Sequence, residues 1–476
     1  MDQSVTSSVP LVVDVDGTLL ATDSLFESFW RGLGNAPKAT LGAVFSGLPS
    51  RASLKTKLAD VVLPDIASLP LRSTVLAQIK AAQADGRMVV LASGADQRIV
   101  DALATRLGLE GNHYGTSPSV NFTGDHKAAR LVERFGEGGF DYIGDSAADL
   151  SIWTVARQGY VIEPTGRLRA AIAAKGLTPK SIPADSRPYG LVRAMRPQQW
   201  VKNLLLLLPL LSAHRFDVAT LGTVLLGIVA FSAAASSIYI VNDLLDLSAD
   251  RQHPQKRFRP FAAGDSSILS GMALSLGLSA GALGLAGFIG WQLVGLIAVY
   301  MLLSLAYSLH LKRLRWLDVA MLATLYTLRI VAGSLAAGLD MSGWLANFIF
   351  PVFIALGCVK RLTELANAPK GKTLAGRGYK PEDRGDLLNI AIASTFAATV
   401  IFVMYSYSTI ASVLYVQPWV LRLAAIVIPI WLGRMISRGW RGQMDHDPIV
   451  FALRDVRGLG LLTSALVLVL VAAGLI

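Results

Sequence analysis

The sequence predicts two unlike parts: an N-terminal α/β domain with a parallel sheet, followed by an all-α bundle of helices that span a membrane. In the first part, short apolar runs alternate with stretches of mixed polarity, which is typical of strands alternating with helices. From Trp200 onward, the apolar runs become long enough to cross a bilayer. Of the 476 residues, 53% are hydrophobic and only 16% are charged, against about 25% in a typical soluble protein. Much of the chain is therefore expected to lie in lipid.

The α/β part is predicted over residues 1–185. Its apolar runs LVVDV, MVVLAS and DYIGD are expected to be buried strands. The stretch 178–188 is rich in Pro and Ser, and we interpret it as a linker. The membrane domain is accordingly assigned to residues 186–476.

The membrane part is predicted to contain nine transmembrane helices, since each crossing needs about 20 predominantly apolar residues. The stretch from residue 266 to residue 310 contains no Asp, Glu, Lys or Arg and is too long for one crossing, so it is divided near Gly290. The predicted spans lie near residues 200–214, 219–241, 267–288, 291–311, 317–338, 343–359, 387–414, 419–434 and 458–476.

The segments between these spans differ sharply in charge. One side receives almost no charge beyond Arg215, Asp217 and Asp340. By the positive-inside rule, the basic side is cytoplasmic. We therefore expect a multi-pass protein of the cell inner (cytoplasmic) membrane, with the N-terminal domain and both active sites on the cytoplasmic side and the C-terminus outside. The basic side holds Arg193, Arg196, Lys202, residues 251–259, Lys312, Arg313, Arg315, residues 360–384 and residues 434–457.

The net charge of +11 is interpreted as this cytoplasmic excess of Lys and Arg. Because the basic residues flank the membrane and form no single patch, nucleic acid is not expected as a partner. The one cysteine, Cys358, excludes an internal disulfide. Residues 1–9 are polar, so no signal peptide is expected.

Polar side chains with phosphate chemistry follow the predicted strands of the N-terminal part. Two carboxylates two residues apart at a strand end can have different catalytic roles, because one can attack phosphorus while the other transfers a proton. A serine ends a second strand, a lysine opens a helix, and two more carboxylates follow a third strand. These residues are Asp14, Asp16, Ser93, Lys127, Asp145 and Asp149.

This set resembles that of the haloacid dehalogenase superfamily of phosphatases, over most of residues 10–175. The resemblance implies a Rossmann-like sheet with a small helical cap at about residues 21–75. It also implies that Asp14 is the nucleophile, that Asp16 donates and accepts protons, that Ser93 binds a phosphate oxygen and that Lys127 offsets phosphoryl charge. The Mg²⁺ ligands would come from Asp14, Asp16, Asp145 and Asp149. Basic cap residues such as Lys55 either contact an anionic substrate or form a solvated helix face.

The membrane part carries an acidic motif directly after its second predicted span, in NDLLDLSAD. Asn242, Asp246 and Asp250 are four residues apart and would share one helix face, with Asp243 beside it. Carboxylates at the C-terminal end of an apolar helix face the negative pole of its dipole, so a cation should compensate them. Mg²⁺ prefers oxygen ligands and is the natural candidate. The alternative is a helix end neutralised by Lys256, Arg257 and Arg259.

The predicted spans and this motif resemble the UbiA superfamily of intramembrane prenyltransferases, over roughly residues 190–476. The resemblance implies that the motif holds a diphosphate through Mg²⁺, so that each domain has one Mg²⁺ site. Family members carry a second aspartate-rich motif after the sixth span. Here Lys360, Arg361 and Glu364 stand in its place, with Arg377 and Tyr379 further along. A basic second motif favours direct binding of a substrate anion by cations.

The stretches RPQQWVKN, HPQKRFRPFAAG and GRGY further resemble one subgroup, the decaprenyl-phosphate phosphoribosyltransferases. This implies that phosphoribosyl pyrophosphate is the donor and that a polyprenyl phosphate in the lipid bilayer is the acceptor. The fused phosphatase would then remove the 5-phosphate, giving polyprenyl-phosphoryl ribose, a precursor of lipid-linked pentose donors for cell wall synthesis. A homo-oligomer is compatible with this. The predicted substrate-binding residues are Lys202, Asn203, Lys256, Arg257, Arg259, Lys312, Arg329, Lys360, Arg361, Glu364, Arg377 and Tyr379.

Two alternatives remain beside this interpretation. The membrane part could be an aromatic or quinone prenyltransferase that uses an allylic diphosphate, which predicts a second acidic motif. The N-terminal domain could act as a separate phosphatase or as a non-catalytic docking module. A buried arginine in lipid is costly and usually functional, so Arg329 is expected either to bind phosphate or to pair with Asp318 or a helix carbonyl. Tyr307 is expected to be an interfacial anchor.

Overall fold

The computed structural model describes residues 9–48, 50–117, 121–184, 187–369, 373–374, 377–444 and 447–476. The chain forms two compact units. Unit 1 comprises Met1–Met195 and Tyr239–Leu274, and unit 2 comprises Arg196–Ile238 and Ser275–Ile476. The predicted boundary between residues 185 and 186 lies outside the described residues. Helices α11 (Val218–Leu245) and α14 (Ile268–Ile289) each contribute residues to both units.

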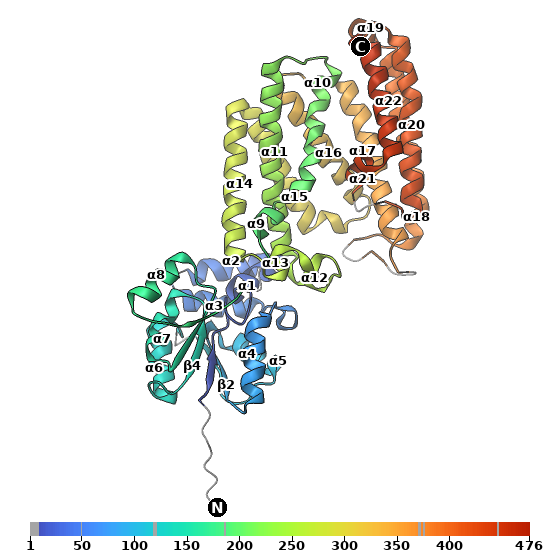
Figure 1. Ribbon diagram of the computed structural model, residues 1–476. Helices are drawn as coiled ribbons and strands as arrows, with labels where there is room; N and C mark the ends of the chain where they lie inside the picture. Colours follow the sequence, from blue (N-terminus) through green and yellow to red (C-terminus); the bar gives the residue numbers. More distant parts are fainter. Residues whose placement is uncertain are drawn as a thin grey trace, which may run out of the picture. The chain divides into compact units, whose positions relative to one another are not determined.

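Unit 1 contains a six-stranded sheet with the order β3-β2-β1-β4-β5-β6, in which every pair is parallel. This confirms the predicted parallel α/β domain. The three runs expected to be strands form β1, β2 and β4, and β1 lies between the other two (Figure 1). The strands are β1 (Leu11–Val13), β2 (Val89–Asp96), β3 (Tyr114–Thr116), β4 (Asp141–Gly144), β5 (Gln158–Ile162) and β6 (Lys180–Ile182).

Helices cover both faces of this sheet, so its strands are apolar on both sides. Along β1, Leu11 and Val13 belong to one buried cluster and Val12 to the other. The first cluster includes side chains of α4 and α5, and the second includes side chains of α6, α7 and α8. Figure 1 shows α4 and α5 on one side of the sheet and α6, α7 and α8 on the other. These helices are α4 (Ser73–Ala84), α5 (Gln97–Leu107), α6 (Gly124–Phe135), α7 (Leu150–Val155) and α8 (Gly166–Ala174).

Three further helices lie between β1 and α4, where the cap was expected. They are α1 (Ser24–Asn35), α2 (Pro37–Gly47) and α3 (Arg51–Val61). Unit 1 also includes the short helices α9 (Gly190–Ala194), α12 (Leu247–Gln252) and α13 (Pro260–Ala263). The acidic motif of the membrane part therefore belongs to unit 1.

The membrane part is helical, and within the described residues seven helices are long and apolar enough to cross a membrane. The number rises to eight if the bent pair α21 and α22 counts as one span. The chain is therefore a multi-pass membrane protein, and the nine crossings predicted remain unconfirmed. These helices are α11, α14, α15 (Trp291–Leu309), α16 (Leu317–Ala336), α17 (Gly343–Ala366), α18 (Arg384–Ser406), α20 (Pro418–Trp440), and the pair α21 (Pro448–Arg454) and α22 (Val456–Ala472).

The predicted bounds differ most from the observed helices in three spans. The first is a 3-10 helix, Pro197–Leu207, followed by the short α10 (Leu208–Ser212). The predicted span 387–414 ends earlier, at Ser406, and α19 (Thr409–Leu414) forms a separate helix. The predicted span 343–359 continues to Ala366 as α17, so Lys360, Arg361 and Glu364 lie on its last two turns.

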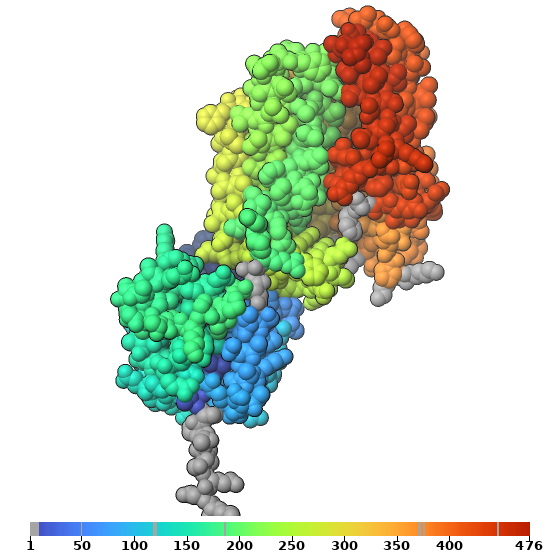
Figure 2. Space-filling model, viewed as in Figure 1, coloured from blue at the N-terminus to red at the C-terminus, as the bar shows by residue number. Residues whose placement is uncertain are grey.

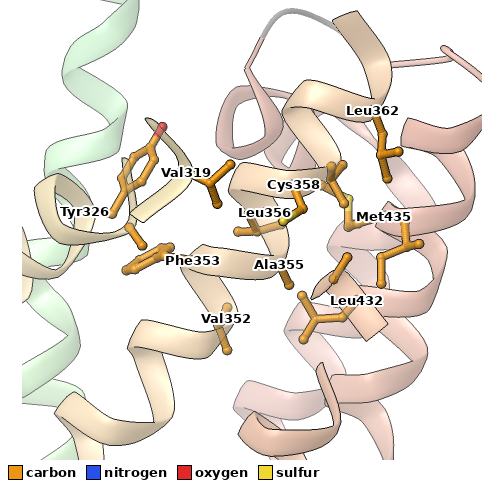
Figure 3. Close-up of a cluster of buried hydrophobic side chains, with 14 of the residues drawn as sticks. Val319, Tyr326, Val352, Phe353, Ala355, Leu356, Cys358, Leu362, Leu432 and Met435 are labelled. Carbon is orange, nitrogen blue, oxygen red and sulfur yellow. The ribbon is translucent and has the colours of Figure 1, made fainter. Parts of the chain in front are cut away.

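The core of unit 2 lies among α16, α17 and α20, with α18 packed alongside. Figure 3 shows part of this cluster, in which Val319 lies beside Leu356 and the ring of Phe353 lies beside that of Tyr326. Cys358 is fully buried among them. Small residues allow the close approach of these helices: a Cβ at Gly439 would lie 2.8 Å from Val359 Cγ1.

Candidate functional site

The predicted nucleophile Asp14 lies at the carboxyl end of β1 and is paired with Lys127. The Lys127 ammonium donates to Asp14 Oδ1 at 2.7 Å and to the carbonyl oxygen of Ala92 at 3.1 Å, and it lies 3.5 Å from Asp149 Oδ1. All three charged side chains are buried. Burial raises the pKa of Asp14 and outweighs the opposite effect of Lys127, while Asp149 raises it further. Lys127 therefore sits where it can offset charge on a phosphoryl group bound to Asp14.

Asp145 lies against the turn that follows Asp14, at Gly17. Gly17 has a φ of +78°, and a Cβ there would lie 2.2 Å from Asp145 Oδ2. Only glycine permits this close approach together with the left-handed backbone. Thr18 Oγ1 donates to Asp145 Oδ1 at 3.1 Å. The glycine of the DVDGT motif thus allows Asp145, which follows β4, to lie against the turn after β1.

Asp16 is held by the first residue of α1. The backbone amide of Ser24 donates to Asp16 Oδ1 at 2.8 Å, and Ser24 Oγ donates to Oδ2 at 3.0 Å. Burial, with a contribution from Asp23, raises the pKa of Asp16 to about 7, although Lys55 opposes this. A carboxyl group with a pKa near neutrality can both give and take a proton at the working pH.

The other predicted residues have defined partners. Asp149 accepts from the Tyr142 hydroxyl at 2.6 Å on one oxygen, and from the Ser146 amide and hydroxyl, each at 3.0 Å, on the other. Asp149 therefore shapes the loop after β4. The buried Ser93 Oγ accepts from the Ala95 amide at 3.2 Å, which leaves its hydroxyl proton to donate.

Two cations near this site were not among the predicted catalytic residues. Lys55, on α3, donates to the carbonyl oxygen of Gly94 at 2.5 Å, directly after Ser93. Arg72 Nε donates to the carbonyl oxygen of Gly17 at 3.0 Å. Burial raises the pKa of Asp145, and the charge of Arg72 opposes this rise without outweighing it. Lys55 is one of the basic cap residues named above, but no local pattern distinguishes it from a solvated lysine. Arg72 belongs to no motif, so the sequence does not indicate that it lies at the site.

The donor chemistry of this site fits a divalent cation. Burial, Asp14 and Asp149 together raise the pKa of Asp145 to about 8, so the carboxylates repel one another. Among the described residues, no three His, Cys, Asp or Glu side chains group closely enough to hold a metal by themselves. Mg²⁺ is usually bound by one or two carboxylates together with water and substrate phosphate. Asp14 and Asp145 are the residues that would supply such carboxylates.

The acidic motif of the membrane part begins on the last turn of α11 and continues onto α12. The helix breaks at Asp246, but the spacing of four survives, because the Asp246 amide donates to the Asn242 carbonyl and the Asp250 amide to the Asp246 carbonyl. Arg259 Nη1 lies 3.1 Å from Asp243 Oδ1 and 2.7 Å from Asp250 Oδ2. Asp243, expected beside the face, thus shares a cation with Asp250.

This motif also fits a metal. Asn242 Oδ1 is a buried oxygen with no hydrogen-bond partner among the described residues, which is costly unless a ligand satisfies it. Burial raises the pKa of Asp250 to about 6, and Arg259 lowers it less than burial raises it. Of the three basic residues predicted here, Arg259 reaches the carboxylates directly, whereas Lys256 and Arg257 are exposed.

In unit 2, Asp318 binds two basic residues of the region where a second motif was expected, Arg361 and Arg377. Arg361 Nε and Nη2 donate to its two oxygens at 2.5 and 2.9 Å, and Arg377 Nη1 donates at 2.9 Å. Tyr307, expected to be an interfacial anchor, donates its hydroxyl to Asp318 at 2.8 Å. Arg361 also lies 2.5 Å from Glu364. Both guanidinium groups therefore have carboxylate partners here. Tyr379 accepts from the Trp316 amide at 3.2 Å beside them.

Arg329 bonds to a carbonyl of its own helix, one of the partners expected for it: its Nη1 donates to the Leu325 carbonyl oxygen at 2.5 Å. Its Nε donates to Asn203 Oδ1 at 3.0 Å, and its Nη2 donates to the Tyr300 hydroxyl at 3.1 Å. The guanidinium carbon also lies 5.2 to 5.3 Å from the ring centres of Phe231, Tyr300 and Tyr326. Cation–π contacts and hydrogen bonds stabilise this charge at membrane depth. Asn203 joins it to Ser232 through a bond of 2.8 Å.

Two further lysines converge on Asp447. Lys202 forms an ion pair with Asp447. Burial raises the pKa of Asp447, but the charges of Lys202 and Lys360 outweigh burial and hold it below its usual value. The ammonium groups of Lys202 and Lys360 thus face one carboxylate, that of Asp447, and Arg329 lies near Lys202. The positive charge here exceeds the negative charge. Lys312 is half-buried at the start of the segment between α15 and α16.

Comparisons with known proteins address both halves. The UbiA prenyltransferase family matches residues 204–456. The uncharacterized protein y4nM of Sinorhizobium fredii is 37% identical over 454 residues, covering 94% of this chain and 88% of that protein, so it shares both halves. A decaprenyl-phosphate phosphoribosyltransferase of Mycolicibacterium smegmatis is 39% identical over 204 residues, covering 40% of this chain and 62% of that protein. A solved UbiA homologue from Archaeoglobus fulgidus, bound to GPP and Mg²⁺, is 14% identical with a TM-score of 0.46 and covers 59% of this chain and 99% of that one.

Proposed function

Because the chain belongs to the UbiA prenyltransferase family, we propose that it is a bifunctional membrane enzyme that makes a lipid-linked ribose in two steps. Its membrane part transfers 5-phosphoribose from phosphoribosyl pyrophosphate to a polyprenyl phosphate. Its N-terminal domain then removes the 5-phosphate. One observation carries the proposal: a full set of phosphatase residues around Asp14 stands in one chain with a region 39% identical to a phosphoribosyltransferase over 204 residues.

In the first step, a phosphate oxygen of the polyprenyl phosphate attacks C1 of ribose. The bond between C1 and the pyrophosphate oxygen breaks, and pyrophosphate leaves with the electron pair. A leaving group with several negative charges must be stabilised by cations as it departs. Asn242, Asp243, Asp246 and Asp250 would hold Mg²⁺, which when bound supplies this stabilisation.

The cations of unit 2 act on the anionic groups of the substrates. Lys202, Lys360 and Arg329 carry more positive charge than Asp447 can neutralise, and this favours binding of a phosphate. Asp318 holds Arg361 and Arg377 in fixed positions. A positioned guanidinium loses little entropy when it binds a phosphate oxygen. These residues replace the second acidic motif that an allylic diphosphate enzyme would carry.

In the second step, Asp14 attacks the phosphorus of the 5-phosphate and the bond to the ribose 5-oxygen breaks. Asp16 donates a proton to that oxygen. It then takes a proton from the water that attacks the aspartyl-phosphate, and inorganic phosphate is released. Lys127 and Ser93 stabilise the phosphoryl oxygens. Asp14 and Asp145 would hold Mg²⁺, which when bound neutralises charge on the phosphoryl group.

We further propose that the membrane domain, residues 186–476, crosses the inner membrane nine times, with residues 197–212 as the first crossing. Basic residues then face the cytoplasm together with the phosphatase domain, and the C-terminus lies outside. The product, polyprenyl-phosphoryl ribose, remains in the membrane as a precursor of pentose donors. Because both activities belong to one polypeptide, the intermediate forms on the chain that consumes it.

The test uses the full-length protein in liposomes with Mg²⁺, polyprenyl phosphate and phosphoribosyl pyrophosphate, and resolves the products by mass. Wild type should yield the dephosphorylated ribosyl lipid, and Asp14→Asn should stop at the phosphorylated one. Glu133→Gln, at an exposed pair outside the site, should behave as wild type. No ribosyl lipid at all, with consumption of an allylic diphosphate instead, would overturn the proposal.

A further inference from the structure

A groove lined by arginines lies in unit 2 where α20 ends and α21 turns into α22. Two adjoining cavities with volumes of about 410 and 780 Å³ form it. Helices α20 and α22 pack against each other along this edge, and in Figure 2 they form the orange-red and red surface. The arginines that line the groove are Arg434, Arg438, Arg441, Arg454 and Arg457.

The helices bring these arginines to the same groove. Arg434 and Arg438 are four residues apart and share one face of α20, and Arg441, the residue directly after the helix, continues that spacing. Asp455 accepts from Arg434 Nε and Nη2, both at 2.7 Å, and it also caps α22 by accepting from the Gly458 amide at 3.0 Å. The axes of α21 and α22 differ by 88° at this residue. The bend therefore places Arg454 and Arg457 at the same groove.

The charge of the groove is strongly unbalanced. Among the described residues that line it, Asp455 is the one acidic side chain, against five arginines. Like charges held together on rigid helices repel, and an anion relieves that repulsion. Guanidinium groups bind phosphate oxygens with two parallel hydrogen bonds. The chemistry of the groove is thus that of a phosphate site.

The apolar neighbours of the groove distinguish a lipid from a free anion. Ile430 lies one turn before Arg434 and is 54% exposed, and Leu461 lies one turn after Arg457. Trp440, also exposed, ends α20 next to Arg441, and exposed tryptophans are typical of the headgroup level of a bilayer. The groove therefore has cations at the headgroup level and apolar helix surface deeper in the membrane.

We propose that this groove binds the phosphate headgroup of an anionic membrane phospholipid, whose acyl chains lie along α20 and α22. Basic pockets between transmembrane helices on the cytoplasmic side suit such headgroups. None of the groove residues belongs to the sites proposed above, so the two proposals can fail separately.

The experiment measures the thermal denaturation midpoint of the full-length protein in detergent micelles that contain phosphatidylcholine, with and without phosphatidylglycerol. A lipid that binds only the folded state raises the midpoint. Wild type should shift upward by several degrees with phosphatidylglycerol. The triple variant Arg438→Gln, Arg441→Gln, Arg457→Gln should lose most of that shift. The matched control Arg134→Gln, Arg167→Gln, Arg169→Gln, at exposed positions of unit 1, should keep it.

Native mass spectrometry of the same samples should count fewer bound phosphatidylglycerol molecules on the triple variant than on wild type. If the triple variant does not fold, Arg441→Gln alone, at an exposed position, should lose part of the shift. Three outcomes would overturn the proposal: a shift that survives these substitutions, the same shift with inorganic phosphate alone, or a shift with polyprenyl phosphate and none with phosphatidylglycerol.

Discussion

Arg251 and Glu27 form a buried ion pair, with Nη2 of the arginine 2.5 Å from Oε1 and Nη1 3.0 Å from Oε2. Their side chains are 6% and 3% exposed. Arg251 follows Asp250 of the acidic motif, whereas Glu27 lies on α1, the helix whose first residue, Ser24, holds Asp16. Within unit 1, one ion pair thus links the segment that carries the transferase motif to the helix that positions the phosphatase acid.

Glu27→Gln should destabilise this linkage by about 3–5 kcal/mol, because it leaves the buried guanidinium of Arg251 without a countercharge. The effect should be local. Hydrogen exchange measured by mass spectrometry on the full-length protein should be faster in α1 and α12, and unchanged in α20. The double variant Glu27→Leu, Arg251→Met should recover most of the protection, since it removes both charges. Wild-type exchange in Glu27→Gln would contradict the prediction.

Asp16→Asn should lower the rate of phosphate release by about 10²–10⁴-fold, the usual contribution of a general acid and base. Asparagine can still accept from Ser24, so the fold should survive. The transferase step should continue, and the phosphorylated ribosyl lipid should accumulate. Phosphate release from that lipid measures the effect, and a loss below tenfold would exclude Asp16 as the proton donor.

Arg361→Lys should destabilise the membrane domain, because an ammonium cannot bond both oxygens of Asp318 and also reach Glu364, as the guanidinium does. The expected cost is about 3 kcal/mol, at the low end for a broken buried pair. The half-life of transferase activity at elevated temperature measures it. The control Arg313→Lys changes an exposed arginine outside the cluster and should leave that half-life unchanged.

Asp141 should make the free energy of unfolding of the α/β domain depend on pH in the acidic range. Burial raises the pKa of Asp141, but hydrogen bonds and charge from Arg157 and Arg87 outweigh it, so the pKa lies below its usual value. The stabilisation is present above the unfolded pKa of about 3.9 and is lost as pH falls through the lower folded pKa. Asp141→Asn should therefore flatten the decline of the unfolding midpoint below about pH 4. An unchanged decline would show that other carboxylates cause it.

The phosphatase site could be predicted from the sequence because its residues stand at the ends of strands. Parallel strands present their carboxyl ends at one edge, so Asp14, Ser93 and Asp145 had to converge once the strands were recognised. The long apolar helices were equally visible, because their length follows from the thickness of the bilayer. The 3-10 helix Pro197–Leu207 could not be distinguished from an α-helix, because 3-10 and α-helical segments share one apolar composition.

The role of Asp318 could not be predicted, because its partners are distant in the sequence. Arg361 and Arg377 follow it by 43 and 59 residues. The packing of α16 on α17 brings Arg361 to Asp318, and Arg377 reaches it from the segment after α17. The same holds for Arg329, whose partner Asn203 lies 126 residues away. A single charged residue in an apolar run indicates that some partner exists, but it does not say which one.

The buried position of Cys358 has a practical consequence. The chain has one cysteine, and that thiol is enclosed by the core of unit 2. Any cysteine introduced at an exposed site would therefore be the one thiol open to a membrane-impermeant maleimide, with no background to remove first. Labelling at Ser342 and at Arg441 in sealed vesicles of known orientation would then report directly which ends of the helices face each compartment.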